Sequence, residues 1–186
     1  MATTTFIYVT DTGSSAVSVI NTQTNTIIAT ISVGSIPLGI AVNSSTNTIY
    51  VVNYGSNTVS VIDGSSNSVT ATISVGSSPQ GGVAVNSSTN TIYVANTNSN
   101  TISVIDGSSN TVNATIPAGE DSCPIGVAVN SLTNTIYVAN SCSSSVSVIN
   151  GSSNSVIATI TIPSPASPCL IALNLSTNTI YVTNYN

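Results

Sequence analysis

The chain of 186 residues contains no Lys, no Arg and no His. Its net charge of −5 comes from five acidic residues, and 3% of its residues are charged, whereas about 25% is usual in soluble domains. Without cations it cannot neutralise phosphates or an anionic membrane surface, so we expect no nucleic-acid partner. Without His or Lys it has neither an imidazole base nor a Schiff-base amine. The composition therefore predicts a protein that is not an enzyme and has no cofactor.

Long apolar runs are absent as well. No segment approaches the ~18 apolar residues of a membrane helix, so no membrane span is predicted. The first ten residues, MATTTFIYVT, lack the basic start and apolar core of a secretory signal. Hydrophobic residues nevertheless make up 41% of the chain, which is too many for disorder at this low charge. The sequence predicts a folded protein held by apolar burial, hydrogen bonds and any disulfides.

The chain does contain one short strand sequence that is repeated five times. The copies are NTIYVVN at 47–53, NTIYVAN at 90–96 and 134–140, and NTIYVTN at 178–184. TFIYVTD at 5–11 is a more divergent copy. Each full unit of about 43 residues divides at turn signals into four β-rich runs, named A to D. In the unit that begins at Pro79 these runs are GVAVN, TIYVAN, TISVID and TVNATIP.

Four short strands in a unit of this length predict an all-β fold, a β-propeller built from four-stranded antiparallel blades. The alternative is a solenoid, in which the units stack along a line. Runs B and C carry apolar residues on both faces, as expected for a blade between two neighbouring blades. Run D alternates polar and apolar residues, as expected for an outer strand half in water. The pattern favours the propeller.

The unit resembles the YVTN family of β-propeller repeats. The residues that carry the resemblance, over 6–186, are P.G.AVN, TNTIYV.N, SVID or SVIN followed by Gly, and N.V.ATI; IYVTN itself stands at 180–184. The family often has Pro after the Asn of the A–B turn, where this chain has Ser44, Ser87, Ser131 and Leu175. The resemblance implies a propeller and an extracellular or cell-surface location, because many members are secreted or surface-layer proteins of archaea and bacteria. It implies no catalytic motif.

We expect one domain over residues 1–186, with a partial unit 6–36, full units 37–78, 79–123 and 124–167, and a partial unit 168–186. This division gives 17 strands, whereas four blades need 16, so the first and last copies of run B compete for one place. The surplus strand is frayed or attached at an edge, or it pairs between chains in a closed ring of two or an open polymer, or the chain is a section of a longer propeller.

A free edge strand without Lys or Pro invites pairing with another chain. Because both terminal copies of run B are such strands, we predict that a second copy of the chain is the partner. The predicted assembly strands are centred on Ile7, Tyr8, Val9, Ile180, Tyr181 and Val182.

Three cysteines lie in connecting loops. Cys123 precedes the last full unit and Cys142 lies in the B–C loop of that unit, so a Cys123–Cys142 disulfide is the candidate pairing. It would close a loop of about 20 residues and stabilise the fold by roughly 3 kcal/mol. Cys169, in the next D–A loop, is an alternative partner or a free thiol.

The acidic residues give few site candidates. Asp63 and Asp106 stand in IDGSSN, where other units have Asn21 and Asn150, so we interpret all four as Asx-turns. Glu120 and Asp121 are adjacent and form a calcium candidate, although calcium needs six or more oxygens and a solvated loop is the alternative.

Five sequons are candidates for glycosylation, at Asn43, Asn86, Asn113, Asn150 and Asn174. Three of them hold the same place in the A–B turn, which predicts a glycan coat on one rim and possible glycan partners. Tyr50, Tyr93 and Tyr137 share one mid-strand position, and we expect them in the core with the hydroxyl reaching a partner.

Together these observations predict a non-enzymatic extracellular structural or cell-surface glycoprotein. It would self-assemble through its terminal β-strands into a filament, sheath or surface layer. The alternative is a secreted β-propeller binding module that recognises a glycan or a protein through its B–C and D–A loops.

Overall fold

The computed structural model describes residues 5–163 and 165–185. In this part of the chain there are 17 strands and no helix. The strands are β1 (Phe6–Asp11), β2 (Ala16–Asn21), β3 (Thr26–Ser32), β4 (Pro37–Asn43), β5 (Thr48–Asn53), β6 (Thr58–Asp63), β7 (Ser68–Ser74), β8 (Val83–Asn86), β9 (Thr91–Asn96), β10 (Thr101–Asp106), β11 (Thr111–Pro117), β12 (Pro124–Asn130), β13 (Thr135–Asn140), β14 (Ser145–Asn150), β15 (Ser155–Thr161), β16 (Ser167–Asn174) and β17 (Thr179–Tyr185).

The strands form five antiparallel sheets in chain order. Three sheets have four strands each, β4–β7, β8–β11 and β12–β15, and they correspond to the three full units. The sheet before them, β1–β3, has strands B, C and D but no strand A, and the sheet after them, β16–β17, has only strands A and B. We call these five sheets 1 to 5. The fold is all-β and propeller-like.

Asn residues build the hairpins that connect the strands. At each A–B turn the first Asn caps the turn, as where the Asn43 side-chain oxygen accepts a hydrogen bond from the Ser45 amide at 3.1 Å. The last residue of the turn has a left-handed backbone, with φ of 52° at Asn47 and 51° at Asn90. Asn tolerates this conformation better than most residues. The repeated turn sequence therefore fixes where each hairpin bends.

The sheets pack face to face, and each junction follows the same rule. The face that carries the Tyr of strand B, called the tyrosine face, packs on the opposite face of the next sheet, called the isoleucine face. Between sheets 2 and 3, Tyr50 of the tyrosine face packs with Ile92 and Ile105 of the isoleucine face. Between sheets 3 and 4, Tyr93 packs with Ile136 and Ile149. Strands B and C of the central sheets are therefore buried on both faces. This burial explains why they carry apolar residues on both faces.

The outer strands behave as their alternation predicts. In β7 the single fully buried residue is Ile73, and most of the strand is exposed. Tyr50 and Tyr93 are fully buried, as expected of core residues. The prediction that the hydroxyl reaches a partner is wrong for Tyr50, whose buried oxygen has no hydrogen-bond partner. That oxygen lies beside Gly107, where a Cβ would be 2.8 Å from it.

The inner strands approach one another so closely that only glycine fits between them. A Cβ on Gly39 would overlap the carbonyl oxygen of Gly81 in the next sheet, and a Cβ on Gly82 would overlap that of Ile125. Gly126 meets the carbonyl oxygen of Cys169 in the same way. The glycine of the P.G.AVN element therefore allows backbone-to-backbone contact along the inner edge of the row.

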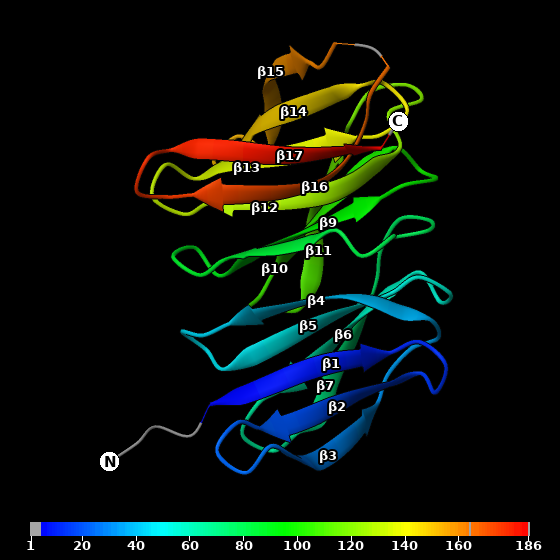
Figure 1. Cartoon of the computed structure of the whole chain (residues 1–186), viewed down its shortest axis with the longest axis vertical. Helices are drawn as coiled ribbons and strands as arrows, with labels where there is room; N and C mark the ends of the chain where they lie inside the picture. Colours follow the sequence, from blue (N-terminus) through cyan, green and yellow to red (C-terminus); the bar gives the residue numbers. More distant parts are fainter. Residues whose placement is uncertain (1–4, 164, 186) are drawn as a thin grey trace.

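The row of sheets is open in the part of the chain that the structure describes. Figure 1 shows sheets 1 to 4 following one another along the longest axis, with sheet 5 at the level of β12 and β13 and with β1 and β17 well separated. Strand β1 pairs with β2 and strand β17 pairs with β16, so both terminal copies of strand B have a place. The predicted 17 strands are present, but β16 does not join β1 within the chain.

The glycine contact gives a first testable prediction. Gly82→Ala is expected to lower the free energy of unfolding by about 1–3 kcal/mol, because the new methyl group must push β8 away from β12. Gly13→Ala is the matched control: a Cβ there meets only an Asp11 oxygen at 3.6 Å, and a change within roughly 0.5 kcal/mol is expected. Chemical denaturation of both variants measures the difference, and equal stabilities would contradict the tight contact.

Candidate functional site

The isoleucine face of sheet 1 is uncovered. Ile7 is 50% exposed and Val9 is 44% exposed. The residues at the same positions in sheet 2, Ile49 and Val51, are 0% exposed because sheet 1 packs on them. Ile20, which pairs with Ile7 across strands β1 and β2, lies on the same face. This face is built like an internal junction but has no neighbour.

The tyrosine face of sheet 5 is uncovered as well. Tyr181 is 60% exposed, whereas Tyr50 at the same repeat position is fully buried. Leu170 is also 60% exposed, and it stands four residues before the last Asn of strand A, as Gly39 and Gly126 do in their strands. The C-terminal end of the row therefore presents a second unpartnered apolar face.

Within the described residues, sheet 5 has only strands A and B, and it leaves part of sheet 4 uncovered. Ile160 of β15 is 44% exposed. Its counterparts Ile31, Ile73 and Ile116 lie between 2% and 6% exposed, since a complete sheet covers each of them. In sheet 4, β15 lies on the far side of β14 from β12 and β13, the strands that β16 contacts.

Of the predicted assembly residues, the structure places Ile7 and Val9 on one open face and Tyr181 on the other. Tyr8, Ile180 and Val182 are half-buried, because their sides of β1 and β17 face the neighbouring sheets. Strands β1 and β17 do not meet within the chain (Figure 1). Leu170 and Ile160 were not predicted; the signal for Leu170 is a leucine at the glycine position of the repeat. Contiguous exposed apolar surface of this kind is typical of an interaction site.

The A–B turns carry a cross-sheet hydrogen-bond ladder. The Asn43 side-chain amide donates to the side-chain oxygen of Asn90 in the next sheet at 2.7 Å, and Asn86 donates to Asn134 at 2.8 Å. Asn130 donates to Asn178 at 2.9 Å. The donors Asn43 and Asn86 are 0% exposed. A polar group that is buried this completely needs a hydrogen-bond partner. The ladder therefore connects each of sheets 2, 3 and 4 to the sheet that follows it.

This ladder bears on two glycosylation candidates. The side chains of Asn43 and Asn86 are buried between sheets in the folded chain, so they are less accessible to a glycan than the other candidates. The turn Asn is buried because it reaches the neighbouring sheet and not because of its own hairpin. The remaining candidates, Asn113, Asn150 and Asn174, are exposed.

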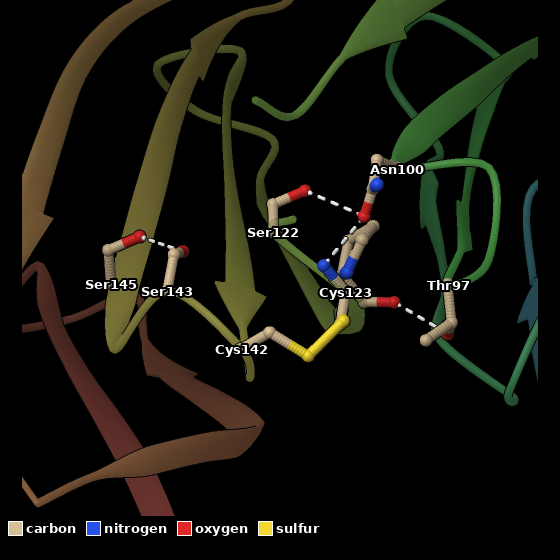
Figure 2. The surroundings of a disulfide bond; sticks show 8 residues. Thr97, Asn100, Ser122, Cys123, Cys142, Ser143 and Ser145 are labelled. Carbon is tan, nitrogen blue, oxygen red and sulfur yellow. Dashed lines mark hydrogen bonds between the residues drawn. A yellow bond between two sulfur atoms is a disulfide. The ribbon is translucent and has the colours of Figure 1, made fainter. Parts of the chain in front are cut away.

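A disulfide joins the loop before β12 to the loop between β13 and β14. Cys123 and Cys142 are bonded, and Cys169 is a half-buried free thiol. Figure 2 shows Asn100 beside the disulfide, where its side-chain oxygen accepts hydrogen bonds from the Cys123 amide at 2.9 Å and the Ser122 hydroxyl at 3.4 Å. The disulfide and these bonds hold three loops together at one end of sheets 3 and 4.

The acidic residues of the C–D turns form Asx-turns as predicted. The Asp63 carboxylate accepts a hydrogen bond from the Ser65 amide at 2.9 Å, and Asp106 accepts one from the Ser108 amide at 2.8 Å. These backbone hydrogen bonds are the main cause that lowers the pKa of Asp63 and of Asp106. Hydrogen bonds from Ser14 lower the pKa of Asp11. All three carboxylates are therefore ionised at neutral pH, and each caps its turn.

The calcium candidate has no third acidic side chain beside it in the part of the chain that the structure describes. Glu120 and Asp121 are exposed in the loop before β12. Within the described residues no group of three or more His, Cys, Asp or Glu side chains could hold a metal ion. The same part of the chain has no helix long and apolar enough to cross a membrane.

Comparisons with known proteins address the fold. No protein-family model matches the chain, and no curated protein matches it. Among solved structures, a chain of hydrazine synthase from Kuenenia stuttgartiensis is similar to it, with a TM-score of 0.89 and 23% identity over 96% of this chain. The similar region makes up 52% of the hydrazine synthase chain, so the present chain spans about half the length of that neighbour. At this identity the likeness concerns the fold alone.

Stability is expected to be independent of pH near neutrality and to fall in acid. A pKa that is lower in the folded state contributes stability above the unfolded value, near ~3.9 for Asp, and that stability is lost as the pH falls through the folded pKa. No His is present to titrate between about pH 5 and 8. The Tm should therefore be constant across that window and fall below about pH 4. The Asp63→Asn, Asp106→Asn double variant keeps both turns, and its Tm should fall less in acid than that of the wild-type chain. An equal fall in Tm would contradict the role of these two carboxylates in acid stability.

Glycosylation should follow burial and not the sequon pattern. Expressed in a host that glycosylates sequons, the chain should carry glycans only at exposed sites, Asn113, Asn150 or Asn174. Intact mass before and after deglycosylation, with peptide mapping, measures occupancy. A glycan on Asn86 in folded protein would contradict the hydrogen bond to Asn134.

Proposed function

We propose that the chain is a non-enzymatic structural protein that assembles with copies of itself through its terminal strands. The observation that carries the proposal is the pair of unpartnered end faces, each built from residues that are buried at the internal junctions. In the proposed assembly the C-terminal end of one copy contacts the N-terminal end of the next. Such a head-to-tail contact forms a ring when the rotation closes and a filament when it does not.

Composition supports a scaffold more than a catalyst. The chain has no His, Lys or Arg, and its best-formed polar groups, the Asn ladder and the Asx-turns, serve the packing of sheets and turns. An extracellular or cell-surface location is part of the proposal. The Cys123–Cys142 disulfide supports it, because disulfides persist in oxidising compartments. The resemblance to YVTN repeats in secreted and surface-layer proteins points the same way.

Association should grow with protein concentration. Analytical ultracentrifugation of the 186-residue chain is expected to show species larger than the 18.6 kDa monomer, and electron microscopy should show rings or fibres. Deleting residues 177–186, which removes β17, is expected to reduce association. Leu132→Ser is the matched control, because Leu132 is 77% exposed but lies in the β12–β13 turn, away from both end faces.

A strictly monomeric chain at all concentrations would contradict this proposal. That outcome would favour the alternative, a secreted binding module that uses its B–C and D–A loops.

A further inference from the structure

We infer that β2 and β3 of a second copy complete the sheet that β16 and β17 begin, with β17 replacing β1 of that copy beside β2. This inference rests on the proposed function and specifies its interface. The joint sheet would contain strands A and B from one chain and strands C and D from the next. It would restore the four-stranded pattern of sheets 2 to 4.

The strands missing at one end are those present at the other. Sheet 5 lacks strands C and D, and for that reason Ile160 of sheet 4 is 44% exposed. Sheet 1 has strands C and D, and its Ile20 and Ile27 lie on an open isoleucine face. In every internal junction this face covers the tyrosine face to which Ile160 belongs. The second copy therefore supplies the surface that covers the exposed strip.

Strand β17 is a better strand B than β1. Strands β9 and β13 follow an Asn whose side chain accepts the cross-sheet bond. The internal copies of strand B end in an Asn that donates to strand C hydroxyls, as Asn53 donates to Ser60 at 2.9 Å. Strand β17 has both residues, Asn178 and Asn184. Strand β1 has Thr5 and Asp11 in these places. Beside β2 of the second copy, Asn184 would meet Ser18, the counterpart of Ser60, as its acceptor.

The Asn ladder would also continue across the interface. Asn174 holds the donor position of the ladder but is exposed, since no further sheet follows it among the described residues. Asn47 holds the acceptor position, and among the described residues it receives no cross-sheet bond, because sheet 1 has no strand A. In the joint arrangement β16 lies where strand A of sheet 1 is missing, next to β4 of the second copy. Asn174 of one copy then faces Asn47 of the other.

One residue opposes this arrangement and makes it testable. Leu170 stands at the glycine position of strand A, so its side chain would meet the carbonyl oxygen of Leu38 in the second copy, as a Cβ on Gly126 would meet that of Cys169. Leu170 therefore holds the inner strands apart and weakens the interface. Replacing it by glycine should strengthen association, whereas simple docking of the two apolar end faces would be weakened by the same change.

The first experiment compares the association of point variants by sedimentation. Leu170→Gly is expected to tighten association about tenfold, since the change removes a side chain that clashes with backbone. Tyr181→Ser is expected to weaken it at least about tenfold, because Tyr181 becomes buried in place of Tyr8 of the second copy. Leu132→Ser should change nothing. Thermal unfolding of each variant confirms that the chain is folded.

The second experiment tests the register of the exchanged strand. In sheet 2, Val51 of strand B pairs with Ser60 of strand C, so Val182 should pair with Ser18 of the second copy. Val182→Cys and Ser18→Cys in one chain, with Cys169→Ser to remove the free thiol, are expected to give disulfide-linked multimers under mild oxidation. Either Cys substitution alone gives no ladder of covalent multimers.

The outcomes separate this inference from the proposed function. If the wild-type chain and Leu170→Gly both stay monomeric, the proposed function fails and the inference fails with it. If the wild-type chain associates but Leu170→Gly weakens association, or the cysteine pair forms no crosslink in the assembled protein, strand replacement is overturned while self-assembly stands.

Discussion

The structure depends on one repeated contact, in which the tyrosine face of a sheet packs on the isoleucine face of the next. Each contact needs a strand B with apolar residues on both faces and an inner strand thin enough for close approach, which Gly39, Gly82 and Gly126 provide. Because each sheet offers one face to each neighbour, a row of such sheets always ends in two unlike faces. The end faces are therefore a direct consequence of how the interior is held together.

Amides and hydroxyls take the place that ion pairs have in most proteins. The chain has no cation, so no side-chain ion pair between residues can form. Asn side chains instead cap the turns, bridge the sheets and bind the hydroxyls of strand C. Such neutral hydrogen bonds contribute about 0.5–1.5 kcal/mol each, and they are insensitive to salt. The contribution of these hydrogen bonds to stability therefore does not depend on ionic strength.

Much of the fold could be predicted from the sequence, because the determinants are local and repeated. Strand B, the Asx-turns and the outer alternation of strand D recur with fixed spacing, and these gave the strand count and the sheet order. The burial of Asn43 and Asn86 could not be read in this way, since a sequon describes three residues and their partners lie 47 and 48 residues away. Tyr50 lacks a hydroxyl partner for a similar reason: its surroundings come from the next sheet. The end faces were predicted in part, through Ile7, Val9 and Tyr181. The exposure of Leu170 and Ile160 can be interpreted only when the packing of the neighbouring sheets is known.

The open row also has a mechanical consequence. Its first and last strands, β1 and β17, lie far apart along the longest axis (Figure 1), so tension applied to these two strands passes through every sheet junction in series. The junctions that carry a rung of the Asn ladder join sheets 2 to 5, whereas the junction between sheets 1 and 2 has no such rung among the described residues. At the first junction the load would instead fall on apolar contacts and on the hydrogen bonds from the Thr10 and Thr12 hydroxyls to the Leu38 and Pro37 carbonyls.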